Sequence, residues 1–335
     1  MDFILTDKNR NNTAIMPYDS TLDIEIGGAN DFAITIPNEF YDHNIFIQGG
    51  YLYKAGTEYG GILNEFTSDT AYEDFIYNGL TFRGMMMERY VEPPSGSDYL
   101  TVSGELNSVL ATMFGSTFYG DLFRVSTVDS VVSISSVNVQ RYADYITAAN
   151  SVLSSVNYKV GLEAIEYIEN GIVKFYIEVK AVPIVDYSDE IENSQDGMVD
   201  FKISKKNVMP YNYMLCLGSG ELRNRIIVKL HIVSKDTIEE VNSIVDSDTT
   251  RIYFYDYSSA QSRDDLIASA KEKAKELIDE DSQKITISED FIAFLGDYVG
   301  GRDYVTNTYI KEKITKIVYK YSEGDESFSY TIGGE

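Results

Sequence analysis

Apolar and polar residues alternate along much of this chain, which is the pattern of β-strands that bury one face. The alternation is strict at 22–26 and 32–36, and it continues over a longer run at 173–179. Residues 313–332 form two alternating runs around a polar turn, which predicts a hairpin. Shorter strands are predicted at 45–47, 131–134, 226–233 and 251–255. The chain is therefore expected to be mainly β.

Helical spacing of apolar residues is found in only three places. Residues 106–113 and 142–153 each carry one short apolar stripe. The clearest stripe runs along 266–278, where apolar residues share one helix face and charged residues occupy the other. Such a stripe is typical of a helix that packs on a sheet. We therefore predict an α+β protein in which strands dominate.

Turn-forming and acidic stretches divide the chain into four predicted units. The segment 92–97 contains Pro93-Pro94, and it ends the first β-rich block. A second division follows the acidic stretch at 186–197. In order, we predict a first β block at 1–98, an α/β domain at 99–185, a second β block at 186–232 and 283–335, and a βα insertion at 233–282.

The charge of the chain disfavours nucleic acid as a stable partner. Asp and Glu number 53 against 28 Lys and Arg, which gives a net charge of −25. No base occurs between Arg10 and Lys54, or between Lys180 and Lys202. Because proteins bind nucleic acids by neutralising phosphates with Lys and Arg, stable binding is not expected. The charge fits either a soluble surface or a wall past which a polyanion slides without adhering.

Residue types that carry catalysis are scarce. His43 and His231 are the only histidines and Cys216 is the only cysteine, which disfavours catalytic triads and thiolate metal sites. The sequence has no phosphate-binding loop, no HExxH motif and no GxSxG motif. The acidic turns at 246–248 and 279–281 match no calcium-binding loop. We therefore predict no catalytic, cofactor-binding or metal-binding residue, and no enzyme.

Targeting signals are also missing from the sequence. No apolar run approaches the ~20 residues that a membrane-spanning helix needs. The first residues lack the basic patch and long apolar core of a secretory signal. The protein is therefore expected to be made in a cytoplasm and to have no membrane segment.

Several segments follow a recognisable sequence pattern, in a fixed order along the chain. The segment Gly56–Ile62 matches a TEYGGI pattern. The segment Asn78–Met86 matches a strand pattern GxT[WF]RG, which is followed by the proline exit at Pro93-Pro94. Phe82 stands where tryptophan is more usual. Three later segments, at 218–225, 295–303 and 330–333, follow in the order of the same pattern. Together these segments resemble the tail-tip hub proteins of bacteriophages, also called prophage tail proteins and related to baseplate hubs.

This resemblance, which spans essentially the whole chain, implies that the two β blocks are small β-barrels and that the chain forms a homotrimeric ring. The ring would lie at the virion tail tip or baseplate, made in a bacterial host cytoplasm. The implied partners are the distal tail ring or tail tube, the tape-measure protein, and tip spike or receptor-binding proteins. DNA would pass through an acidic channel without being bound.

The motif residues are expected to be architectural rather than catalytic. Gly60, Gly61 and Gly84 are expected where the backbone has positive φ or approaches another chain segment closely. Arg83 is expected to pair with a carboxylate or with a helix C-terminus.

Two alternative functions stay open at this stage. The sequence ends just after the closing strand of the pattern, so the peptidoglycan hydrolase domain that some relatives carry is expected to be absent. One alternative is nevertheless a cell-wall glycan hydrolase with a carboxylate pair in the unit at 99–185. The other is a receptor- or carbohydrate-binding tail protein, which the 27 tyrosines suggest.

Overall fold

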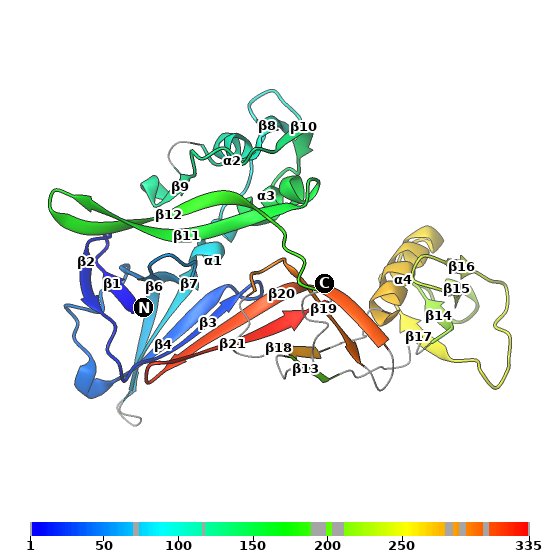
Figure 1. Cartoon of the computed structure of the whole chain (residues 1–335). Helices are drawn as coiled ribbons and strands as arrows, with labels where there is room; N and C mark the ends of the chain where they lie inside the picture. Colours follow the sequence, from blue (N-terminus) through cyan, green and yellow to red (C-terminus); the bar gives the residue numbers. More distant parts are fainter. Residues whose placement is uncertain are drawn as a thin grey trace. The chain divides into compact units, whose positions relative to one another are not determined.

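The computed structural model describes residues 2–69, 74–115, 118–188, 199–202, 211–278, 284–287, 293–303 and 308–333. The chain divides into two compact units. The larger unit comprises Met1–Asp200 and Thr286–Ile332, and the smaller one comprises Phe201–Ile285 with the last three residues. Strands outnumber helices in both units (Figure 1), which confirms the expected mainly β fold.

Ten strands of the larger unit form one curled sheet (Figure 1). They are β1 (Phe3–Thr6), β2 (Asn12–Ile15), β3 (Thr21–Ile26), β4 (Asp31–Pro37), β5 (Tyr51–Lys54), β6 (Gly60–Asp69), β7 (Asp74–Thr81), β19 (Tyr298–Asp303), β20 (Thr308–Ser322) and β21 (Asp325–Ile332). Their order is β19-β20-β3-β4-β7-β6-β5-β1-β2, and β21 pairs with β20. The curl brings Phe3 of β1 against Tyr319 of β20, with ring centroids 5.6 Å apart.

Alternation along the strands decides which face of this sheet is buried. In β3, Leu22, Ile24 and Ile26 are buried, whereas the residues between them are exposed or half-buried. β4 repeats the pattern. Each such side chain contributes about 1.5–3 kcal/mol when it leaves water. The alternating runs therefore place the core on the concave side of the sheet, where Phe3 and Tyr319 meet.

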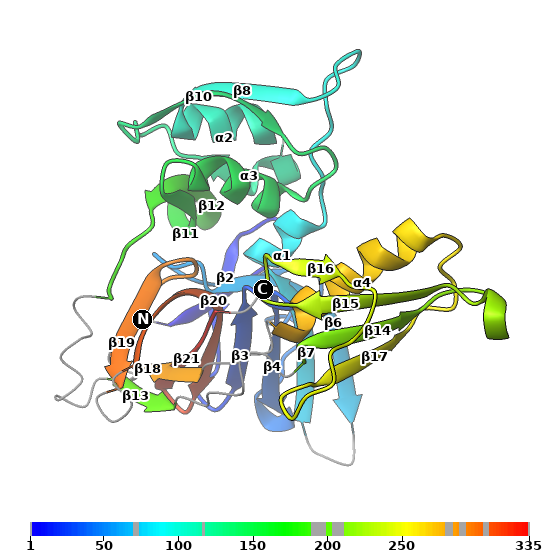
Figure 2. The same cartoon turned by 90° about the vertical axis from the view of Figure 1, so that its right-hand side faces the viewer.

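A long hairpin, three helices and shorter strands form the rest of the larger unit. They are α1 (Phe82–Met87), β8 (Leu100–Glu105), α2 (Leu106–Phe114), β9 (Phe123–Val125), β10 (Ser133–Val139), α3 (Tyr145–Ser154), β11 (Tyr158–Glu169) and β12 (Ile172–Pro183), with short 3-10 helices η1 (Asn38–Phe40) and η2 (Phe118–Asp121). β11 and β12 pair along their whole length, and β9 pairs with β12 in parallel. Helices α2 and α3 lie between the β8–β10 pair and the β11–β12 hairpin (Figure 2).

The smaller unit packs one helix on a four-stranded sheet. Its elements are β14 (Tyr213–Leu217), η4 (Leu222–Asn224), β15 (Ile227–Ile232), β16 (Ile238–Glu240), β17 (Ile252–Asp256) and α4 (Arg263–Ile278). The sheet order is β16-β15-β14-β17. Leu266, Ala270 and Ala274 of α4 are fully buried in a cluster with Met214 and Leu230 of the sheet. The predicted stripe at 266–278 is thus confirmed as a packing face. Strands β13 (Val199–Lys202) and β18 (Lys284–Ile287) pair with each other.

Three sequence predictions about single elements were wrong. Residues 45–47 form a turn rather than a strand, and the buried Phe46 accepts a hydrogen bond on its carbonyl from the Tyr77 hydroxyl at 2.8 Å. The strand predicted at 131–134 begins only at Ser133, since Val131 is exposed with φ of 64°. The second resemblance segment does not stay extended, because β7 ends at Thr81 and a helix follows.

Strand pairing groups the chain differently from the four predicted units. The C-terminal strands β20 and β21, assigned to the second β block, join β3 of the first block in one sheet. Strands β14 and β15 of the second block pair with β16 and β17 from the predicted insertion at 233–282. Alternation predicts where a strand lies and which face it buries, but not which strand it pairs with.

Candidate functional site

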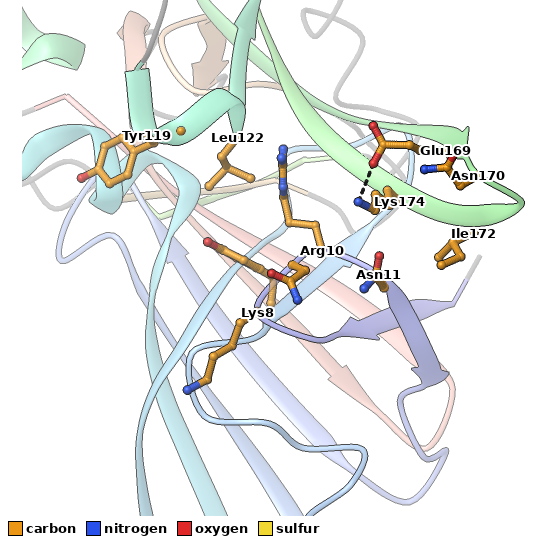
Figure 3. Close-up of a pocket in the computed structure, with 12 residues that line it drawn as sticks. Lys8, Arg10, Asn11, Tyr119, Leu122, Glu169, Asn170, Ile172 and Lys174 are labelled. Carbon is orange, nitrogen blue, oxygen red and sulfur yellow. Dashed lines mark hydrogen bonds and ion pairs between the residues drawn. The ribbon is translucent and has the colours of Figure 1, made fainter.

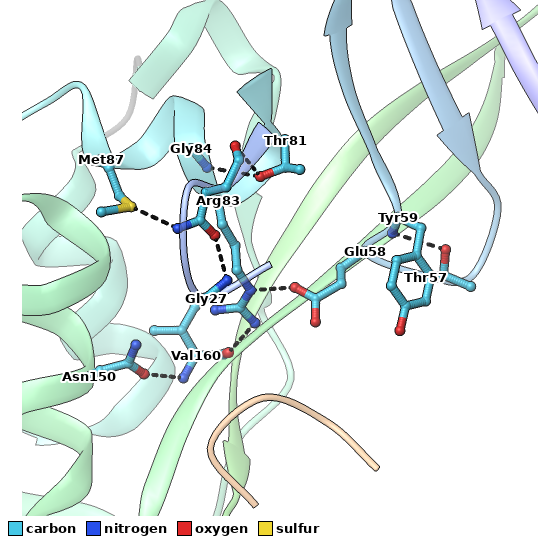
Figure 4. A network of polar contacts seen from close by, with 11 residues as sticks. Gly27, Thr57, Glu58, Tyr59, Thr81, Arg83, Gly84, Met87, Asn150 and Val160 are labelled. Atoms are coloured by element: carbon cyan, nitrogen blue, oxygen red, sulfur yellow. Dashed lines mark hydrogen bonds and ion pairs between the residues drawn. The ribbon is translucent and has the colours of Figure 1, made fainter. Parts of the chain in front are cut away.

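Two of the segments that carry the resemblance meet in a buried ion pair (Figure 4). Glu58 lies in the turn before β6, and Arg83 lies in the first turn of α1. The Arg83 Nε donates to the Glu58 carboxylate, and its Nη2 donates to the carbonyl of Val160 in β11 at 3.1 Å. The side chains are 5% and 9% exposed, respectively. This confirms the expectation that Arg83 pairs with a carboxylate.

The start of α1 fixes the position of Arg83. Thr81 ends β7, and its hydroxyl accepts a hydrogen bond from the backbone N–H of Gly84 at 3.2 Å, which caps the helix. The same hydroxyl donates to the carbonyl of Asn30 at 2.9 Å. A Cβ on Gly84 would lie 2.3 Å from the carbonyl oxygen of Asn30, so this close approach requires glycine, as the sequence predicted.

A second buried ion pair lies within electrostatic range of the first. Lys159 of β11 and Asp297, which precedes β19, approach to 2.6 Å between Nζ and Oδ1. At this separation the ammonium and the carboxylate form a buried ion pair. Burial lowers the pKa of Lys159, Asp297 opposes that change, and the charges of Arg83 and Glu58 also act on it. Asp297 accepts further hydrogen bonds on its two oxygens from the backbone N–H groups of Val185 and Phe294.

The two pairs form what we call the four-charge cluster: Glu58, Arg83, Lys159 and Asp297. Its members come from the β5–β6 turn, from α1, from β11 and from the segment before β19. The formal charges sum to zero, and each carboxylate is matched by a cation. Because both carboxylates are buried and paired, neither is placed to accept a proton from a substrate or to donate one to it. The cluster joins the hairpin to the curled sheet and to the C-terminal segment.

Other segments of the resemblance do not join this cluster. The segment 218–225 lies in the smaller unit, where Arg225 pairs with Asp256 at 2.5 Å. The segment 330–333 includes the end of β21, where Ile332 pairs with Ile314 of β20. Side chains of Arg302 and Asp303 lie outside the described residues.

The histidines and the cysteine take no part in a catalytic arrangement within the described residues. The ring of His231 stacks on Tyr213 with centroids 4.6 Å apart. His43 lies in an exposed turn, 3.8 Å from Asp42. Cys216 is fully buried, and burial raises the pKa of its thiol to about 12, so the thiolate nucleophile is suppressed.

Metal binding and membrane spanning depend on the grouping of ligating side chains and on the length of the helices within the described ranges. No group of three or more His, Cys, Asp or Glu in those ranges is placed to hold a metal ion. The acidic turn at 279–281 and most of the stretch at 186–197 lie outside the described residues. None of the helices described is long and apolar enough to cross a membrane.

A surface pocket of about 570 Å³ lies at one end of the β11–β12 hairpin (Figure 3). Its lining includes Lys8 and Arg10 from the β1–β2 turn, Tyr119 from η2, and Glu169 and Lys174 from the hairpin. Sequence reasoning missed this pocket. Lys8 and Arg10 stand just before a long base-free stretch, but only the fold brings the hairpin beside them.

The chain is similar to several solved structures at low sequence identity. No protein-family model matches the sequence, and no curated protein matches it. Similar solved structures include a prophage tail protein of Listeria monocytogenes, at 13% identity and a TM-score of 0.48 over 100% of this chain and 95% of that one. A tail protein of Neisseria meningitidis is 11% identical, with a TM-score of 0.46 over 99% and 96% of the two chains. A chain of the phage P2 baseplate is 9% identical, with a TM-score of 0.42 over 100% and 99%.

Proposed function

We propose that this protein is a structural hub of the tail tip or baseplate of a bacteriophage or phage-like particle. The four-charge cluster carries this proposal. Glu58, Arg83 and Asp297 come from three segments that resemble tail-tip hub proteins, and they converge on one buried set of contacts. Segments that are similar in order along the chain and also joined in space support a shared architecture better than either fact does separately.

The proposed role is assembly rather than catalysis. The charged motif residues already have partners within the protein. Arg83 donates hydrogen bonds to Glu58 and to the carbonyl of Val160. Asp297 pairs with Lys159 and accepts hydrogen bonds from two backbone N–H groups. A catalytic site instead needs groups that are free to exchange protons or electrons with a substrate. The residues of the resemblance therefore hold the scaffold together.

The finer proposal is a homotrimeric ring that joins the distal tail ring or tail tube to the tip. In this arrangement other tail proteins, including the tape-measure protein and a tip spike or receptor-binding protein, are the partners. Part of the acidic surface would line the channel, where a net charge of −25 per chain keeps a polyanion from adhering.

Electron microscopy of purified particles tests this role. A small affinity tag on the chain, decorated with an antibody fragment, is expected to mark the tail tip with three copies per particle. Label on the tail shaft or head, or particles that lack the chain, would contradict the hub. Clearing of purified cell walls by the isolated chain would instead favour the glycan hydrolase.

A further inference from the structure

The pocket beside the hairpin is lined mainly by the β1–β2 turn, by η2 and by the end of the β11–β12 hairpin (Figure 3). The β1–β2 turn is fixed by Asp7, whose carboxylate accepts the backbone N–H groups of Asn9 at 2.8 Å and Asn11 at 2.9 Å. Its other oxygen accepts the side-chain amide of Asn11 at 2.7 Å. An isolated bridge pairs Asn11 with Lys174 of β12. The basic residues of this turn are therefore held beside the hairpin rather than on a free loop.

Arg10 is the basic residue that this architecture directs into the pocket (Figure 3). Its backbone has φ of 67°, a conformation that residues other than glycine rarely adopt. One guanidinium nitrogen, Nη1, donates to the carbonyl of Asp121 at 2.8 Å. Its Nε and Nη2 find no hydrogen-bond acceptor among the described residues. Burial raises the pKa of Tyr51, and the positive charge of Arg10 opposes this rise.

The other charges around the pocket leave an excess of positive charge. Lys174 pairs with Glu169 at 2.6 Å, so these two cancel. Lys8 lies at the rim and has no ion-pair partner among the described residues. Arg10 is thus the cation that extends into the pocket, whereas the Lys8 side chain points away from it (Figure 3), and the net charge of the whole chain is −25. A basic pocket on so acidic a protein is not explained by solubility, which the acids already provide.

We propose that this pocket binds a small anionic ligand, a phosphate or carboxylate group on a polar carrier, with Arg10 as its main anchor. The planar guanidinium has a fork of donors that suits either oxyanion. The volume of about 570 Å³ lies within the usual range for small-ligand sites. Amide side chains of Asn9 and Asn170 on the lining suit a hydroxylated or amide-bearing carrier. This inference does not depend on the hub role.

Calorimetric titration of the full-length chain tests the site. The probes are inorganic phosphate, glycerol 3-phosphate and glutarate, so that the phosphate and carboxylate sources are compared directly. At least one probe is expected to bind saturably at about one site per chain. Its affinity is expected to fall as ionic strength rises, because the anchor and the ligand are both charged. Absence of saturable binding by all three probes would overturn the proposal.

Variants separate binding from folding. R10Q is expected to weaken binding about tenfold or more, since a hydrogen bond to a charged group contributes about 1.5–3 kcal/mol. K320Q removes the same charge from the exposed Lys320–Asp23 pair on the curled sheet and is expected to bind like the wild type. Equal affinities of R10Q and K320Q would refute the assignment.

A gain of affinity supplies a readout that loss of stability cannot mimic. E169Q removes the carboxylate that neutralises Lys174, so the anion is expected to bind severalfold more tightly. Unchanged or weaker binding by E169Q, in a variant that unfolds at the wild-type temperature, would show that the pocket does not hold the anion.

Discussion

At the scale of single residues, the four-charge cluster determines how the hairpin is held on the curled sheet. Glu58 and Arg83 are both more than nine-tenths buried, so each compensates a charge that water cannot reach. Replacing such a pair by apolar residues is often neutral, whereas removing one partner strands the other charge. The cost of a substitution therefore depends on what is left behind.

Arg83→Met is expected to lower the free energy of unfolding by about 3–5 kcal/mol, because it leaves the Glu58 carboxylate buried without a cation. Urea unfolding followed by far-ultraviolet circular dichroism measures this change. This signal is chosen because the chain has no tryptophan whose fluorescence could report unfolding.

Two matched variants check the cause of that loss. Lys320→Gln breaks an exposed pair with Asp23 and is expected to cost about 1 kcal/mol or less. The double variant Glu58→Met/Arg83→Met removes both charges and is expected to recover most of the stability. A double variant no more stable than Arg83→Met would mean that packing, rather than charge, accounts for the loss.

At the scale of elements, the β8–α2 junction depends on one carboxylate. Glu105 is the N-cap of α2, and its oxygens accept the backbone N–H groups of Asn107 at 2.9 Å and Ser108 at 2.7 Å. It also accepts the N–H of Ser130 at 2.9 Å, which ties the segment before β10 to the same helix end. Burial acts to raise the pKa of Glu105, but the hydrogen bonds from Ser130, Asn107 and Ser108 outweigh it and lower the pKa to about 2.

The acid stability of the protein is expected to depend on this cap. Because the folded-state pKa is depressed, the stabilisation is fully present above the unfolded value of 4.5 and is lost as pH falls towards about 2. Glu105→Gln is therefore expected to have a lower melting temperature than the wild type near neutral pH. The difference between the two melting temperatures is expected to shrink as the pH falls through that acid range.

Melting curves at several pH values between about 7 and 2 measure this dependence. Glu312→Gln, which removes an exposed carboxylate of β20, serves as the control and is expected to follow the wild type. A constant gap between Glu105→Gln and the wild type at all pH values would contradict a titrating cap.

Element positions followed from the sequence wherever one physical signal dominated. The alternation at 22–26 and the stripe at 266–278 each predicted an element that the structure contains. The turn at 45–47 was wrongly predicted as a strand because Phe46 is buried in a turn, where its carbonyl accepts a hydrogen bond from Tyr77. A short apolar run does not distinguish a buried turn from a strand. Helix α1 was missed because its cap, Thr81, also ends a strand.

At the scale of the whole molecule, the smaller unit has a core of its own. The α4 side chains Leu266, Ala270 and Ala274 are buried against strands of the same unit, in a cluster that includes Cys216. A unit with its own apolar core is expected to fold without the rest of the chain.

A fragment of residues 201–285 is therefore expected to unfold cooperatively on heating. Leu266→Ala in the fragment is expected to destabilise it by about 2–5 kcal/mol, because it leaves a cavity under α4. Circular dichroism of both fragments measures this. Lys271→Ala is the control, because Lys271 is on the same helix but is only half-buried. A fragment without a thermal transition would show that its core needs the larger unit.

Pairings between distant segments are what the sequence could not supply. Nothing in the alternating pattern indicates that β20 lies beside β3, or that Lys159 meets Asp297, because a strand pattern records its own faces and not its neighbours. The resemblance identified Glu58, Arg83 and Asp297 as belonging to motif segments, but it assigned no partner to any of them. Arg10 and its pocket had no signal beyond a basic turn.

The four-charge cluster also constrains how this chain can change over evolutionary time. A single substitution that removes the charge of Glu58, Arg83, Lys159 or Asp297 leaves a buried charge without its partner, and selection on stability would remove most such variants. Stability is kept only when both members of an ion pair are replaced together, for example when both become apolar. We therefore expect descendants of this chain to retain these four residues or to exchange them in pairs, while exposed positions drift independently.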